Sequence, residues 1–312
     1  MIDALAKKGV SQVKIGISSY CLTGELYNGE MTILDVLQWA KDNGCDHIEF
    51  VPYGFTLVDN LDLADQVVQK AQDLGLEISN YCMPANFCQE TKEEFDAEMA
   101  RVKEHVDLLN HMGIKSLRHD VVAFRSTPEE ANIHSFNRRL PQIVEGSQII
   151  ADYAAQFEIT TSIENHGWGV QHSERVQRVH KLVDRENFKV VVDVGNFLCV
   201  DELPMIGVMN TLPLASHIHF KDFYYRPLYE DPGEGRWFKT VNGNFLRGSI
   251  FGQGDLPVRA IMRLIKQSGY DGYISLEFEG MEECKEGTRI SLNNIGRLWD
   301  EVSVCLSIDE TP

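Results

Sequence analysis

The chain has 312 residues, of which 43% are hydrophobic, and a formal net charge of −18 from 29 Lys and Arg against 47 Asp and Glu. This hydrophobic content supports a large core and argues against disorder. The negative charge disfavours nucleic acid and anionic membranes as partners, because proteins bind both through their phosphates. No apolar run approaches the roughly 20 residues needed to span a bilayer. We therefore expect a globular protein with no nucleic-acid or membrane partner.

The cysteines and the N-terminus bear on location. The chain has 7 cysteines, an odd number, and none forms a CxxC pair. Scattered cysteines of this kind are typical of reduced thiols in a cytosolic protein rather than of a disulfide framework. The first ten residues, MIDALAKKGV, lack the basic-then-apolar pattern of a secretion signal. These features predict a cytoplasmic protein.

Short apolar, strand-like segments recur along the chain, with helical patterns between them. In chain order they are residues 13–18, 46–51, 76–81, 114–119, 159–164, 189–194, 216–221 and 272–277. Several follow a glycine that closes a helical pattern, as in DLGLE and HMGIK. Strands that alternate with helices pair in parallel through right-handed crossovers. Eight such units predict an α/β fold, a single (β/α)8 TIM barrel over residues 1–312. An open doubly wound sheet is the alternative, but no GxGxxG motif follows the first strand.

One connection is unusually long. Residues 222–256 follow the seventh strand and are rich in glycine, aromatic and charged residues. Long loops in compact domains are usually functional or disordered. Because this segment starts close to a candidate metal ligand, we predict that it is an active-site loop that covers the substrate.

Four side chains of types that commonly bind metals lie at the ends of four successive strand-like segments in the second half of the chain: Glu164, Asp193, His219 and Glu277. The carboxyl ends of the strands of a parallel barrel meet at one mouth, where such folds carry their chemistry. A single carboxylate at a strand end is more often a surface or capping group. Four at successive ends favour a site for one divalent cation. The oxygen-rich set favours Mn²⁺ or Mg²⁺, with Co²⁺ or Zn²⁺ possible.

Other candidates lie near the predicted mouth. His166 is a candidate second base, or else a hydrogen-bonding loop histidine. Glu49 on the second strand is a candidate for binding a substrate hydroxyl, or else a structural ion pair. His119 ends the fourth strand, and this position near the barrel mouth makes it a candidate for binding the substrate. Trp237 and Arg247 in the long loop are candidates for stacking on a sugar and for binding it.

Five segments, SIENHG, VVDVGN, HIHFKD, GQGDLP and GYISLEFEG, resemble the xylose isomerase-like TIM barrel superfamily. Within it, the chain resembles the sugar phosphate isomerase/epimerase group, which includes relatives of inosose dehydratase and ketose 3-epimerase. The resemblance implies that Glu164, Asp193, His219 and Glu277 are metal ligands. It also implies that Glu164 and Glu277 exchange protons with the substrate, and that Lys221, the lysine of an H-x-K-D motif, is a catalytic residue.

One departure from the family pattern concerns the substrate. Ketose epimerases of this superfamily typically have histidine three residues after the metal-binding aspartate, where this chain has Asn196. Asn196 can hydrogen-bond a substrate hydroxyl but cannot titrate. The same departure argues against the DNA-repair endonuclease branch, which needs more histidines for three zinc ions.

We predict a metal-dependent isomerase or epimerase that transfers a proton next to the carbonyl of a keto-sugar or related polyol. The alternatives are a metal-dependent dehydratase of a keto-cyclitol such as inosose, and a non-catalytic sugar-binding barrel. The expected partner is a small sugar or cyclitol, and the expected assembly is a homo-oligomer, either a dimer or a tetramer.

Overall fold

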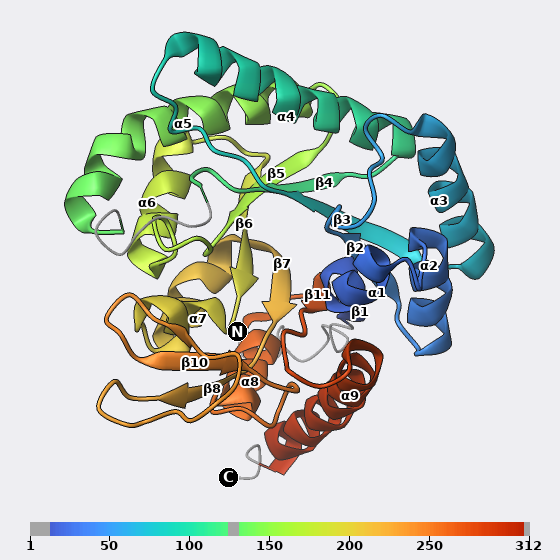
Figure 1. The fold of residues 1–312 in the computed structure, drawn as a ribbon, viewed down its shortest axis with the longest axis vertical. Helices are drawn as coiled ribbons and strands as arrows, with labels where there is room; N and C mark the ends of the chain where they lie inside the picture. Colours follow the sequence, from blue (N-terminus) through green and yellow to red (C-terminus); the bar gives the residue numbers. More distant parts are fainter. Residues whose placement is uncertain (1–12, 124–130, 309–312) are drawn as a thin grey trace, which may run out of the picture.

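The computed structural model describes residues 13–123 and 131–308. Within these residues, eight parallel strands close into a barrel surrounded by helices (Figure 1). The strands are β1 (Lys14–Ser18), β2 (His47–Phe50), β3 (Glu77–Met83), β4 (Ser116–His119), β5 (Thr160–Glu164), β6 (Phe188–Asp193), β7 (Ala215–Phe220) and β11 (Tyr273–Leu276). They follow this order around the barrel, and β11 closes it against β1 with Ile17 opposite Leu276.

All eight predicted strands are therefore confirmed, as is the barrel. Side chains of a strand alternate between its two faces. In β6, Val190 and Val192 belong to the hydrophobic core, whereas Asp193 is on the opposite face. Because of this alternation, an apolar strand can present one polar side chain at its end, on the face opposite the hydrophobic core.

The helices pack their apolar faces on the outside of the barrel. They are α1 (Thr23–Asn28), α2 (Ile33–Asp42), α3 (Leu61–Leu74), α4 (Lys92–Met112), α5 (Ile133–Ala155), α6 (Ser173–Val183), α7 (Pro204–Thr211), α8 (Val258–Ser268) and α9 (Cys284–Ile308). Short 3-10 helices are η1 (Ser19–Leu22), η2 (Asn196–Val200) and η3 (Leu212–Leu214). As predicted, glycine ends α3, α4 and α8: Gly75, Gly113 and Gly269 have φ of 59°, 73° and 74°, which side chains with a Cβ disfavour.

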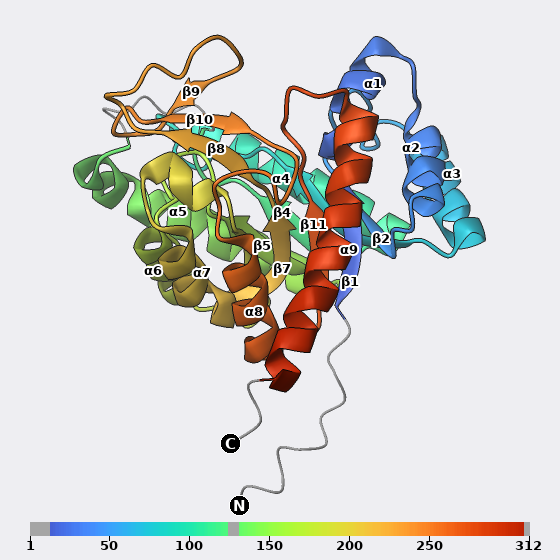
Figure 2. The ribbon, with the colours of Figure 1, turned by 90° about the horizontal axis from the view of Figure 1, so that it is seen from below.

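The long connection is folded. It forms an antiparallel sheet of β8 (Phe223–Arg226), β10 (Phe245–Gly248) and β9 (Phe238–Lys239). Figure 2 shows this sheet at the same end of the barrel as α1. Asp222 ties the two ends of the segment together, because its carboxylate accepts hydrogen bonds from the backbone N–H groups of Phe223, Gly252, Gly254 and Leu256.

Two findings bear on the predictions about location. Among the described helices, none combines the length and the apolar character needed to cross a membrane. The cysteines whose side chains are described are all free thiols: Cys21, Cys45, Cys82, Cys88, Cys199 and Cys284.

Candidate metal centre

The structure brings the four predicted ligands together at the carboxyl ends of the strands. Glu164 ends β5, Asp193 ends β6, His219 lies near the end of β7, and Glu277 directly follows β11. One ligand atom from each lies within 4.8 Å of every other, and all four side chains are buried. Three carboxylates and one imidazole in such a cluster fit a single divalent cation.

Asp193 is held so that one oxygen faces the cluster. Its Oδ1 accepts hydrogen bonds from the backbone N–H groups of Gly195 and Asn196, both at 2.8 Å. The side chain of Asn165 bonds both the N–H and the C=O of Asp193. Oδ2 of Asp193 lies 3.3 Å from Nζ of Lys221. Burial raises the pKa of Asp193 to about 6, an effect that Lys221 only partly offsets.

The electrostatics of His219 also favour a cation. Its Nδ1 is buried, makes no hydrogen bond, and lies 3.6 Å from Oε1 of both Glu164 and Glu277. Burial alone would lower the pKa of His219, but Glu49, Glu277 and Glu164 outweigh it and raise the pKa well above its usual range. The cluster therefore attracts additional positive charge, as a metal site must.

Lys221 lies at the other side of the cluster. Its Nζ contacts Glu277 at 2.8 Å, Glu279 at 3.1 Å and Asp193 at 3.3 Å. Burial alone would lower its pKa, but these three carboxylates raise it well above the usual range. Lys221 is therefore an ammonium ion that can hold carboxylates or a substrate oxygen, and it is not a base at neutral pH.

A pocket of about 300 Å³ opens beside the cluster. This is the lower end of the range for small-molecule sites, about 300–1,000 Å³. Its lining is Tyr20, Val51, Tyr53, Cys82, Met83, Pro84, Arg118, Asp120, Glu164, His166, Lys221, Glu277 and Glu279. Four predicted catalytic residues, Glu164, His166, Lys221 and Glu277, thus share one pocket.

A hydrogen-bonded pair extends this site. Nδ1 of His166 lies 2.9 Å from Oδ1 of Asp120. Arg118 contacts Glu164 at 2.6 Å and Asp120 at 3.3 Å. Burial alone would raise the pKa of Asp120, but Arg118 and His166 outweigh it and lower the pKa. Asp120 is therefore an anion that orients the imidazole of His166.

Two residues predicted to bind the substrate contact candidate metal ligands. Asn196 is buried, and its Nδ2 donates to Oε1 of Glu164 at 2.9 Å. Glu49 is completely buried and does not line the pocket; it contacts His219. The structure places both next to ligands rather than in the space open to a substrate.

The other three predicted substrate-binding residues lie away from the pocket lining. The ring of His119 is completely buried, with Phe87 at 5.2 Å. The guanidinium carbon of Arg247 lies 4.9 Å from the ring centres of both Tyr224 and Trp237. No residue of the segment 222–256 belongs to this lining, so its role as a substrate cover stays a prediction.

Sequence reasoning missed Arg118 and Asp120, which line the pocket where His119 does not. The sequence of β4 nevertheless indicates which of its side chains face inward. Leu117 and His119 share a face of β4, and Leu117 is apolar and belongs to the core outside the barrel. The alternation therefore points Arg118 inward, to the face that carries the chemistry.

A closed (β/α)8 barrel with carboxylates and an imidazole at its carboxyl end defines a class of α/β-barrel proteins with a candidate metal centre. The sequence matches the family described as Xylose isomerase-like TIM barrel over residues 37–298. This chain belongs to that family.

Known proteins similar to the chain include enzymes of two kinds. An inosose dehydratase of Lacticaseibacillus casei is 26% identical over 201 residues, which are 61% of this chain and 65% of that protein. The match thus spans just under two thirds of that relative's length. The solved structure of an L-ribulose 3-epimerase has a TM-score of 0.72 at 14% identity and covers 96% of this chain and 99% of its own.

A third similar protein was solved with a metal. A xylose isomerase-like TIM barrel protein from Mycobacterium smegmatis, in complex with magnesium, has a TM-score of 0.61 at 19% identity. It covers 86% of this chain and 89% of its own. At these identities the two structures show a shared fold.

Proposed function

We propose that this protein is a divalent-metal-dependent dehydratase of a keto-polyol, in which a proton is removed next to a carbonyl and the hydroxyl on the following carbon leaves as water. The observation that carries the proposal is that Glu164 and Glu277 of the four-ligand cluster line the same pocket as the Asp120–His166 pair. The similarity to inosose dehydratases supports it and points to a cyclitol ketone. When bound, the cation would polarise the carbonyl and stabilise the negative charge that develops beside it.

The environments of the two candidate metal ligands that line the pocket, Glu164 and Glu277, suggest different roles. Burial alone would raise the pKa of Glu164, but Arg118 and His219 lower it well below its usual range. A strongly acidic carboxyl is a poor base at neutral pH. Glu277, the most exposed of the four ligands, lines the pocket with its Oε2 held by Lys221. We therefore assign proton removal to Glu277 and ligand binding to Glu164.

His166 has the position of the group that assists the leaving hydroxyl. Asp120 holds its Nδ1, which fixes the ring in the pocket. In this scheme the C–H bond breaks towards Glu277, a carbon–carbon double bond forms, and the C–O bond breaks as His166 supplies a proton. The products are water and an unsaturated ketone in equilibrium with its tautomers.

Epimerisation or isomerisation is the second candidate. Glu164 and Glu277 both line the pocket, so one can remove a proton and the other return it. In that case no bond to oxygen breaks. The structural similarity to L-ribulose 3-epimerase concerns the fold and is compatible with either reaction.

The decisive experiment follows substrate atoms. The metal-depleted protein, resupplied with Mn²⁺ or Mg²⁺, is incubated in D₂O with inososes and with a panel of ketohexoses and ketopentoses. We expect metal-dependent loss of water from an inosose, seen by mass spectrometry and by ultraviolet absorbance of the product. An isomeric product that carries one deuterium would establish epimerisation instead. Binding without exchange or product would support a sugar-binding barrel and contradict both enzymatic candidates.

Two variants separate the assigned roles. Glu277→Gln should retain the metal, more weakly, and lower C–H exchange with solvent by about 10²-fold or more. His166→Gln should retain C–H exchange but slow the loss of water by about 10²-fold. If Glu277→Gln exchanged as fast as the parent while His166→Gln did not, the base would be His166.

A further inference from the structure

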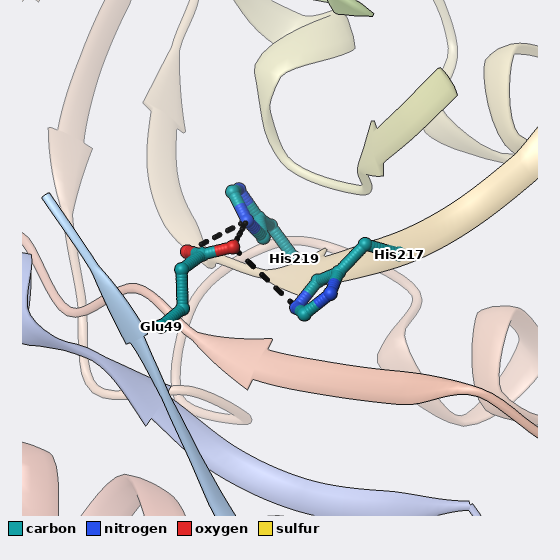
Figure 3. Close-up of side chains that lie close together, drawn as sticks. All are labelled: Glu49, His217 and His219. Atoms are coloured by element: carbon teal, nitrogen blue, oxygen red, sulfur yellow. Dashed lines mark hydrogen bonds and ion pairs between the residues drawn. The ribbon is translucent and has the colours of Figure 1, made fainter. Parts of the chain in front are cut away.

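A second polar cluster, formed by Glu49, His217 and His219, shares His219 with the four-ligand cluster (Figure 3). Glu49 comes from β2 and the two histidines from β7. The three side chains are at most 1% exposed, and none lines the pocket. An ionised carboxylate in such a place is costly unless it is paired and hydrogen-bonded, so its partners identify its role.

The principal partner of Glu49 is the ring of His219. Nε2 of His219 lies 3.0 Å from both carboxylate oxygens, which Figure 3 shows as two dashed lines. Asn80 donates a hydrogen bond to Oε2 of Glu49 at 2.8 Å, and Nε2 of His217 lies 3.5 Å from the same oxygen. A carboxylate can only accept, so Nε2 of His219 must carry the hydrogen.

This contact determines which nitrogen of His219 serves the metal. With Nε2 protonated and bound to Glu49, the ring can offer only Nδ1 to a cation. Nδ1 is the atom that faces Glu164 and Glu277. Histidines that bind metals generally donate their other N–H to a carboxylate or carbonyl, which fixes the ring and makes the ligand nitrogen more basic.

We propose that Glu49 is a positioning residue of the metal centre: it holds His219 in the orientation and tautomer that present Nδ1 to the cation. This inference rests on the metal site of the proposed function but not on the reaction. Glu49 acts through His219 and does not contact the substrate, in contrast to the substrate-binding role predicted from the sequence.

The test compares two substitutions of Glu49. Glu49→Met has a similar length but offers only a thioether sulfur, which is a weak acceptor, whereas Glu49→Gln can still accept a hydrogen bond through its amide oxygen. We expect Glu49→Met to weaken Mn²⁺ binding by about 10- to 100-fold and Glu49→Gln to weaken it less. Free Mn²⁺ is counted by electron paramagnetic resonance during titration of the metal-free protein.

A matched control is Glu98→Gln. Glu98 is a mostly buried carboxylate on α4 that pairs with Arg101 and lies outside the barrel, so its loss should leave Mn²⁺ binding unchanged. Thermal unfolding of the metal-free proteins separates a folding role from a metal role. Removal of one partner of a buried pair is destabilising, so we expect Glu49→Met to unfold at a lower temperature than the parent. Mn²⁺ binding is therefore compared at a temperature at which both metal-free proteins are folded.

The outcomes are distinct. A Glu49→Met protein that binds Mn²⁺ within about twofold of the parent overturns the proposal. If that variant does not fold, Asn80→Ala, which removes the N–H that holds Glu49, should weaken Mn²⁺ binding by a few-fold, and unchanged binding overturns the proposal equally. A parent that binds no divalent cation refutes both this inference and the proposed function. A parent that binds Mn²⁺ but converts no keto-polyol refutes only the function.

Discussion

Single residues at this site serve more than one purpose, and Asp193 shows how. One oxygen accepts hydrogen bonds from two backbone N–H groups and shapes the turn after β6. The other oxygen remains available to the four-ligand cluster. The same division holds for His219, where one nitrogen contacts Glu49 and the other faces the cluster. Loss of a charged oxygen should therefore affect metal binding before it affects the fold.

Replacement of Asp193 tests this division. Asp193→Asn can still accept the two backbone N–H groups but loses the anionic oxygen, and we expect Mn²⁺ affinity to fall by at least about 10-fold. Glu279→Gln is the control, because Glu279 contacts Lys221 but is not part of the four-ligand cluster. Full metal content of Asp193→Asn, measured by atomic absorption, would show that the ligand assignment is wrong.

The pKa of Asp193 also predicts how metal binding depends on pH. Burial raises this pKa to about 6, so Asp193 is protonated below that pH in the metal-free protein. A cation must then displace the proton, since ligand carboxylates bind metals in their ionised form. Each pH unit should lower Mn²⁺ affinity by about tenfold more below pH 6 than above pH 7, because above pH 7 only the proton of His219, whose pKa is raised, still has to be displaced. Calorimetric titration with Mn²⁺ at pH 5, 6 and 7.5 measures this dependence. An affinity that does not change with pH would contradict the prediction.

At the level of elements, the conformation of the segment 222–256 depends on one carboxylate, that of Asp222. Each oxygen of Asp222 accepts two backbone N–H groups from this segment or its flanks. In Asp222→Asn the amide nitrogen must face two N–H donors in either orientation of the side chain. We expect a loss of about 2–3 kcal/mol in unfolding free energy, together with faster proteolysis of the segment. Urea unfolding and limited proteolysis measure the two effects.

Asp255 provides the control for this prediction. It is half exposed and uses only Oδ2 to contact the N–H of Tyr225 and the guanidinium of Arg226. Asp255→Asn can place its amide oxygen in the same position, so its cost should stay below about 1 kcal/mol. Equal stability of Asp222→Asn and Asp255→Asn would contradict the anchoring role of Asp222.

For the whole molecule, buried histidines predict sensitivity to acid. Burial lowers the pKa of His47 and of His119 to about 4. The unfolded chain binds protons at these side chains near pH 6.5, whereas the folded protein does not until about pH 4. Stability that is present at pH 7 is therefore lost as the pH falls from about 6.5 to about 4, by up to about 3 kcal/mol for each ring.

His119→Gln should reduce this loss. The slope of the unfolding free energy between pH 4 and 6.5, measured by urea denaturation, should decrease by up to about one proton. His134→Gln is the comparison, because the His134 side chain is exposed and stays in water in both states. A slope that is the same for His119→Gln and the parent would rule out His119 as a source of the acid sensitivity.

The sequence by itself determined the barrel and the four-ligand cluster. Both follow from local patterns: alternating helices and strands require parallel pairing, and parallel strands bring their carboxyl ends to one edge. The prediction that ligands at the strand ends lie close together therefore requires no knowledge of long-range packing. The left-handed glycines at the helix ends are local in the same sense.

Only the tertiary structure decided what surrounds the ligands. Glu49 meets His219 across 170 residues of sequence, and the pairing of β2 with β3 shifts register at Glu49, so spacing along the chain does not reveal the contact. Arg118 rather than its neighbour His119 faces the pocket, because one residue along a strand reverses the face. Trp237 packs on Arg247 within the small sheet instead of entering the pocket. Such choices depend on packing between distant segments, which no local pattern encodes.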